Sequence, residues 1–308
     1  MSFTKTHIEV ISGWMYRKSR PLDLARYQYH FENGNKEDVI EILKHYQNSD
    51  GGFAHALEPD CWNPNSSPIQ TWYATEIIKE INGLPKEHEI IKGILKYLSS
   101  GESFSNGFWY NTIETNNEYP HAFWWTHKKD SENSKSYNPT INLAGFVLKY
   151  ADKGTMIYDL AAKIVKQGFQ DLLADEIDID MHTILNFLRC YEYCKEVTLD
   201  FSFEKDKIQI KLKELIDDSL EKDFSKWKNE YVCMPSQYNL SPDSEFYKNN
   251  ETICKYETKF ICENFDKNDM WKINWSWSDY KEEWSISKIW WISNKIIINL
   301  LYLKSFKY

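Results

Sequence analysis

The stretch that decides the fold is Gln47–Phe53, which reads Gln-Asn-Ser-Asp-Gly-Gly-Phe. It ends a segment, residues 36–48, in which apolar side chains recur with the period of a helix. Its two glycines supply the backbone freedom for a sharp turn after that helix. We expect Gln47 and Asp50 to cap neighbouring backbone groups, and Phe53 to fill the gap between two helix layers. The stretch therefore predicts a helical hairpin: an outer helix, a turn and an inner helix.

Helical periodicity continues along the rest of the chain. We expect further helices over residues 21–32, 67–81, 86–98, 138–150, 156–173, 180–194, 204–220, 249–263 and 285–306. Several begin with proline, which is favoured in the first turn of a helix. Strand-like alternation is rare, so the chain is predicted to be all-α, an α/α toroid built from helical hairpins. No low-complexity linker interrupts it, and we therefore expect residues 1–308 to form a single domain.

A weak internal repeat connects the long irregular segments, which are expected over residues 51–64, 101–137, 231–247 and 264–283. Degenerate copies of the first motif occur at residues 105–109 and 263–266, each followed by a loop and a predicted helix. Loops this long in a compact domain are usually functional. Because the inner helices of a toroid share one direction, we expect these loops to gather at one mouth of the ring.

Composition excludes several classes of protein. The chain has 46 acidic and 37 basic residues and a formal charge of −9, which disfavours binding to nucleic acid or to anionic lipid. No apolar run reaches the ~20 residues that span a bilayer. The first residues lack the apolar core of a signal peptide, so a cytoplasmic location is expected. The six cysteines form no C-x-x-C pair, which favours reduced, buried thiols over a zinc ribbon.

The aromatic content is high, with 20 tyrosines, 16 phenylalanines and 13 tryptophans. Such side chains fill gaps between helices or line a ligand pocket. Carboxylates beside aromatic rings are candidate general acids, and paired carboxylates suit glycosidic-bond chemistry. The candidate catalytic residues are Glu58, Asp60, Glu114 and His121. The candidate substrate-binding residues are His55, Trp62, Trp72, Tyr119, Trp124, Trp125, Trp275, Trp277 and Glu283.

Structural interpretations stand beside these functional ones. Glu58 and Asp60 would serve equally well to cap loop amides, because carboxylates accept backbone hydrogen bonds. His55 and His121 fit hydrogen-bonded packing roles, and Trp72 lies within a predicted helix where a core position is typical.

The stretch Gln47–Phe53 resembles the Q-x-x-D-G-G-F/W element of the terpenoid cyclase and protein prenyltransferase superfamily, whose members fold as α/α toroids. Residues 20–26, 55–60, 62–71, 119–125 and 285–304 resemble bacterial proteins of similar length that are described as prenyltransferase- or cyclase-like. The resemblance implies the toroid. It also implies an apolar or isoprenoid-like ligand in a central aromatic cavity.

The chemical motifs of that superfamily are not reproduced. The string closest to the D-x-D-D acid of squalene-type cyclases, residues 175–180, lacks the paired terminal aspartates, and no D-D-x-x-D magnesium motif occurs. Prenyltransferases hold zinc with Asp, Cys and a distant His. Here Asp60 and Cys61 are adjacent, without the one intervening residue of that family, and His121 would be the third ligand. We therefore expect no metal and no cofactor.

Three functions remain open from the sequence. The first is a cyclase- or prenyltransferase-like protein, and the second is a carbohydrate-active or carbohydrate-binding toroid using paired carboxylates. The third is a non-catalytic scaffold that binds a peptide or small ligand. A small-molecule ligand is the expected partner in the first two, and the sequence leaves both catalysis and oligomeric state open.

Overall fold

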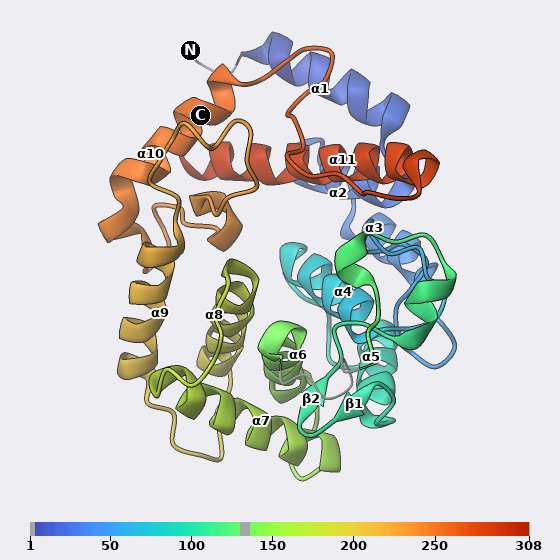
Figure 1. Ribbon diagram of the computed structural model, residues 1–308, viewed down its shortest axis with the longest axis vertical. Helices are drawn as coiled ribbons and strands as arrows, with labels where there is room; N and C mark the ends of the chain where they lie inside the picture. Colours follow the sequence, from blue (N-terminus) through green and yellow to red (C-terminus); the bar gives the residue numbers. More distant parts are fainter. Residues whose placement is uncertain (1–3, 130–135, 308) are drawn as a thin grey trace. The chain divides into compact units, whose positions relative to one another are not determined.

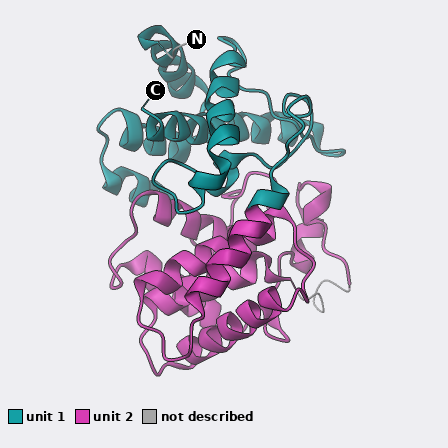
Figure 2. Ribbon diagram, turned by 90° about the vertical axis from the view of Figure 1, so that its left-hand side faces the viewer, with its two compact units in different colours: residues 1–43, 217–308 teal, residues 44–216 magenta. Residues whose placement is uncertain are grey.

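The computed structural model describes residues 4–129 and 136–307 (Figure 1). The all-α class is confirmed, because these residues contain eleven α-helices and only one short strand pair. The chain divides into two compact units, residues 1–43 with 217–308 (unit 1) and residues 44–216 (unit 2), coloured separately in Figure 2. The α/α toroid remains a prediction.

Unit 1 contains the N-terminal and the C-terminal segments of the chain. It contains α1 (Lys5–Lys18), α2 (Pro21–Phe31), nearly all of α3 (Lys36–Lys44), η4 (Pro235–Tyr238), α10 (Tyr247–Glu263) and α11 (Lys281–Ser305). Helix α11 packs against α1, α2 and α10. The sequence analysis missed α1, whose apolar stripe is short. Its Ile11, Trp14 and Met15 are buried in the core of the unit, and this packing stabilises a helix with weak periodicity.

Unit 2 is built from helical hairpins. It contains α4 (Pro68–Glu80), α5 (Glu89–Ser99), α6 (Tyr137–Tyr150), α7 (Met156–Leu173), α8 (Met181–Glu196) and most of α9 (Lys205–Ser219). Helix α6 packs against α4, α7 and α8, and α5 packs against α7. Alternate helices therefore lie in two rows, one of α4, α6 and α8 and the other of α5 and α7. Helices α6 and α8 approach closely, because a Cβ atom added to Gly145 would lie 2.9 Å from the Cα atom of Cys190.

The turn at Gln47–Phe53 has the predicted interactions. The Gln47 side-chain amide donates to the carbonyl of Gly51 at 2.9 Å, and the Asp50 carboxylate accepts from the amide of Gly52 at 2.8 Å. Phe53 is fully buried. Helix α3 ends at Lys44 rather than at residue 48, because the last residues enter this turn, where Gln47 pairs with Phe53.

Glycine is required at the first position of the pair. Gly51 has a φ of +98°, in the left-handed region, and a Cβ atom there would lie 2.1 Å from the carbonyl oxygen of Gly93 on α5. The turn is therefore pressed against the backbone of the next hairpin in unit 2.

The segment expected to be irregular over residues 101–137 contains local structure. Strands β1 (Phe104–Ser105) and β2 (Phe108–Trp109) form a hairpin around Asn106-Gly107, whose positive φ angles suit a two-residue turn. Two 3₁₀ helices follow, η1 (Glu114–Glu118) and η2 (Phe123–Trp125). Residues 130–135 of this segment lie outside the described residues.

Two further expectations bear on the whole of the described chain. Among the described residues, no helix combines the length and apolar character needed to cross a membrane. All six cysteines are buried and free of disulfides, as predicted.

Candidate functional site

The first two repeat loops pair with each other in unit 2. Cys61 forms an isolated antiparallel bridge with His121. On either side, the Trp62 amide donates to the Pro120 carbonyl and the Ala122 amide donates to the Asp60 carbonyl, both at 2.9 Å. The predicted meeting of these two loops is therefore confirmed. We call the paired segments, residues 54–67 and 110–128, the two-loop platform.

Buried amide side chains lock the platform together. The Asn63 side-chain amide donates to Thr115 Oγ1 at 2.8 Å and to Asn116 Oδ1 at 2.9 Å. The Asn116 amide donates in turn to the carbonyl of Trp125 at 3.0 Å. Because Asn63 and Asn116 are almost fully buried, these bonds are shielded from competing water. The platform is thus held by a hydrogen-bond network and needs no regular sheet.

The first platform loop is also tied to helix α4. The Gln70 side chain accepts from the Glu58 amide at 2.8 Å and donates to the Cys61 carbonyl at 2.7 Å. Gln70 is fully buried in the first turn of α4. The start of the inner helix therefore fixes the position of the loop that precedes it.

The candidate acids lie in two different environments. Glu58 and Asp60 are only 4% and 2% exposed, whereas Glu114 is exposed at the start of η1. The Glu58 carboxylate accepts a hydrogen bond from the Asp60 backbone amide at 3.0 Å. The structure therefore favours the capping role for Glu58. A catalytic pair made of Glu114 and either Glu58 or Asp60 stays a prediction, and no contact in the structure supports it.

The two candidate histidines have hydrogen-bonded partners. His121 Nδ1 lies 2.6 Å from the Tyr119 carbonyl oxygen and therefore donates to it, which leaves Nε2 to accept from the Thr126 hydroxyl at 3.1 Å. His55 is exposed, with Nε2 2.9 Å from Asn48 Oδ1. These contacts support packing and loop-fixing roles.

Asp60, Cys61 and His121, the residues compared above with the zinc ligands of the prenyltransferases, all lie on the two-loop platform. Burial raises the pKa of the Cys61 thiol to about 12. Both ring nitrogens of His121 already have partners. Within residues 4–129 and 136–307, no group of three or more His, Cys, Asp or Glu side chains is arranged to hold a metal.

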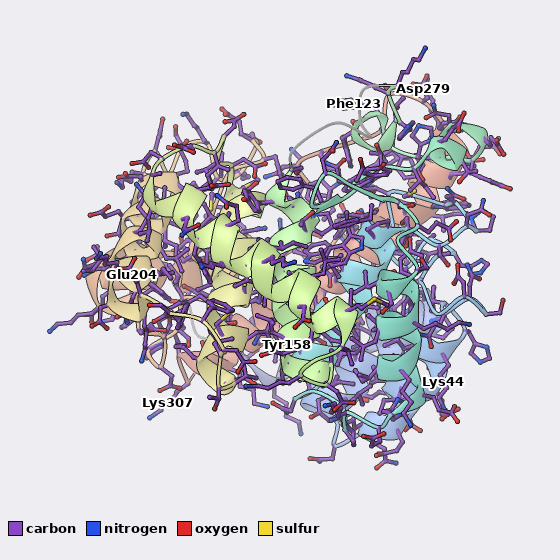
Figure 3. The ribbon with its side chains drawn as sticks, turned by 90° about the horizontal axis from the view of Figure 1, so that it is seen from below. Lys44, Phe123, Tyr158, Glu204, Asp279 and Lys307 are labelled. Carbon is purple, nitrogen blue, oxygen red and sulfur yellow. The ribbon has the colours of Figure 1, made fainter. Side chains whose placement is uncertain are left out.

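Aromatic side chains crowd the second platform loop. Helix η2 consists of Phe123, Trp124 and Trp125, and its Phe123 ring is 64% exposed (Figure 3). The Phe123 and Trp124 ring centroids are 4.9 Å apart in an edge-to-face arrangement. Trp62 and Tyr119 are half-buried on the same pair of loops. The sequence analysis overlooked Phe123, although the run of three aromatic residues was a usable signal.

The third predicted loop belongs to unit 1, where Trp277 is buried and Trp275 is half-buried. Trp275 packs against the hydrophobic core of the unit, with its ring centroid 5.4 Å from that of Trp291. Trp277 is buried, 5.9 Å from Trp284. Glu283 is half-buried in the first turn of α11. These side chains support the start of α11, and the expected common mouth of three loops stays a prediction.

A buried acid that the sequence did not single out lies in unit 1. Glu257 of α10 is 1% exposed; its Oε2 accepts from the Ser236 amide at 2.8 Å, and its Oε1 has no hydrogen-bond partner. Burial raises the pKa of Glu257 to about 7, and burial lowers the pKa of Lys295 on α11 to about 8. The other titratable neighbours of Glu257 are Tyr302, Cys254 and Cys233.

No protein-family model, curated protein or solved structure matches the chain.

Proposed function

We propose that the two-loop platform of unit 2 binds a carbohydrate. The observation that carries this proposal is the exposed Phe123 ring beside Trp124, held on a loop whose backbone is fixed by buried hydrogen bonds. A large ring on a rigid support loses little conformational entropy when a ligand covers it. Exposed aromatic groups on such a support are typical of binding surfaces.

The exposure of the platform favours a sugar over an isoprenoid. An isoprenoid chain binds by burying apolar area, at about 25 cal/mol per Å², and so needs an enclosing pocket. A sugar ring places its C–H face on an aromatic ring while its hydroxyls stay in water or bind polar groups. The exposed carboxylates of Glu114 and Glu118, on the same loop as Phe123, are suitable acceptors for those hydroxyls.

The burial and hydrogen bonding of Glu58 and Asp60 favour carbohydrate binding without hydrolysis. Glu58 accepts a backbone amide and is buried with Asp60, so both support the platform under this proposal. The ligand then contacts aromatic rings and exposed acids. The cyclase-like function becomes an outcome of the test.

We further propose that the helical hairpins close into an α/α toroid. Support comes from unit 2, where α4, α6 and α8 are successive neighbours and α5 packs against α7, the first helix of the next hairpin. The hairpin turn at Gln47–Phe53 supports it as well, because its hydrogen bonds are those expected of the repeat.

The test is equilibrium binding by calorimetry. The wild-type protein is titrated with cello-, xylo-, malto- and chito-oligosaccharides, and separately with geranyl and farnesyl diphosphates. We expect one oligosaccharide class to bind, and Phe123→Ala to weaken that binding about tenfold, since removing a central aromatic contact at a binding surface typically costs more than about 1 kcal/mol. Met156→Ala, which removes a 91% exposed side chain elsewhere in unit 2, is the matched control and should bind normally.

Two results would overturn the proposal. Binding of an isoprenoid diphosphate and of no oligosaccharide would favour the cyclase-like function. Equal affinities of the wild type and Phe123→Ala for the oligosaccharide would move the site away from the platform.

A further inference from the structure

A small pocket of unit 2 lies between helix α7 and the segment that leads into α9. Its cavity volume is about 220 Å³, and it is lined by α7, by residues 201–204 and by Ile208 of α9. Apolar cavities of about 150 Å³ hold benzene, whereas sites for drug-sized ligands span about 300–1,000 Å³. The size of the pocket therefore suits a molecule with a single ring and a short side group.

Helix α7 gives the pocket one polar and one apolar row of side chains. Lys166 and Gln170 are four residues apart, as are Phe169 and Leu173, so each pair follows one line along the helix surface. The polar pair is exposed, whereas Phe169 is buried and Leu173 is half-buried. The α7 wall is therefore polar at the rim of the pocket and apolar at its floor.

Aromatic rings make up much of that floor. Phe201 and Phe203 are half-buried and two residues apart, so they lie on one side of an extended segment. The Phe203 ring centroid is 5.6 Å from that of Phe169 and 6.0 Å from that of Tyr191, a fully buried residue of α8. The floor is thus an aromatic surface whose rings support one another against the core of unit 2.

The polar rim offers hydrogen-bond donors and one unbalanced cation. Among the residues that the structure describes, neither the Lys166 ammonium nor the Gln170 side-chain amide has a hydrogen-bond or ion-pair partner. Glu204, labelled in Figure 3, also lines the pocket, but its carboxylate pairs with Lys207 Nζ at 2.6 Å. A ligand that binds Lys166 and Gln170 breaks no bond within the described protein, and the charge of Lys166 favours an anion.

We propose that this pocket binds a small aromatic carboxylate. The carboxylate accepts hydrogen bonds from Lys166 Nζ and from the Gln170 amide, because it has acceptors only and both side chains donate. Its ring covers Phe169 and Phe203, which adds aromatic contacts to the burial of apolar area. None of these residues belongs to the two-loop platform, so the inference goes beyond the proposed function and does not rest on it.

The test is a titration of the full-length protein followed by the backbone amide shifts in proton–nitrogen-15 NMR spectra. The probes are 3-phenylpropionate, 3-phenylpropionamide and 3-phenylpropylamine, which share a ring and a chain and differ in charge. We expect saturable shifts at residues 166–173 and 201–208, with the carboxylate binding more tightly than the amide and the amine binding most weakly. Octanoate, an aliphatic carboxylate, should bind more weakly than 3-phenylpropionate.

Variants then locate the site. Lys166→Gln should weaken carboxylate binding about threefold, as expected for an exposed ion pair, and leave amide binding unchanged. Lys163→Gln is the matched control, because Lys163 is an exposed lysine of α7 outside the pocket lining, and it should bind normally. Leu173→Trp should fill the pocket and abolish the shifts from every probe, with its fold checked by circular dichroism. If that variant does not fold, the wild-type titration still decides the question.

Three results would overturn the inference. If no probe gives a saturable shift, or if the shifts spread outside residues 166–173 and 201–208, the pocket is not the site. Equal affinities of the wild type for the carboxylate and the amide would remove the role of Lys166. Binding of octanoate as tight as that of 3-phenylpropionate would rule out selection for an aromatic ring.

Discussion

The two-loop platform of unit 2 and the tryptophan-rich loop of unit 1 look alike in sequence and differ in structure. Both follow copies of the same motif, and both combine tryptophans with acids. In the platform, buried asparagines bind the backbone and leave Phe123 exposed. In unit 1, Trp275 and Trp277 turn into the packing around α11. Aromatic composition therefore does not distinguish a loop with an exposed ring from a loop that packs on a core, whereas the hydrogen-bond partners of the loop backbone do.

The test with the largest expected change in stability removes one aromatic ring from each region. Trp277→Ala should destabilise the protein by about 3–5 kcal/mol, because a buried indole leaves a cavity. Phe123→Ala should change the free energy of unfolding by less than about 0.5 kcal/mol, as expected for an exposed surface side chain. Urea unfolding followed by circular dichroism measures both. A large loss for Phe123→Ala would place that ring in the core and remove the platform.

A second test concerns the buried acid of unit 1, which contrasts with the well-paired asparagines of the platform. Glu257 has a folded-state pKa of about 7 against an ordinary value of 4.5. Between these pH values the folded state holds a proton that the unfolded state has released. The contribution of Glu257 to the free energy of unfolding is therefore fully present below about pH 4.5 and is lost as the pH rises through 7.

Glu257→Gln should remove this dependence, because glutamine mimics the protonated acid and still accepts from the Ser236 amide. The variant should match the wild type near pH 4.5 and exceed its stability by about 1–3 kcal/mol at pH 8. Unfolding by urea across this pH range is the measurement. Parallel curves for the two proteins would show that Glu257 titrates normally.

The smallest effect tests the framework of the platform. Asn116→Ala should cost about 1–2 kcal/mol, since it leaves the Trp125 carbonyl and the Asn63 amide each with one bond fewer. Oligosaccharide binding should weaken more than stability alone explains, because the aromatic loop loses its anchor. Hydrogen exchange of the backbone amides in residues 119–127 should speed up in the variant. An unchanged exchange rate would mean that the loop is rigid without Asn116.

Much of the local structure was predictable. Helices α4, α6, α7 and α8 start near a proline or a capping side chain that the sequence displays, and their apolar residues recur with helical period. The roles of Gln47 and Asp50 in their turn were also predictable, because short-range geometry leaves a glycine turn few alternatives. Helix α1 was missed because its three buried residues form too short a stripe to stand out.

The sequence by itself determined most of the helices and the turn at Gln47–Phe53, because local backbone preferences act over short separations. Only tertiary structure decided which acids are buried, which tryptophans are core, and where Asn142 and Glu257 carry unpartnered oxygens. Burial and hydrogen bonding depend on residues far apart in the chain. Neither composition nor periodicity records those neighbours.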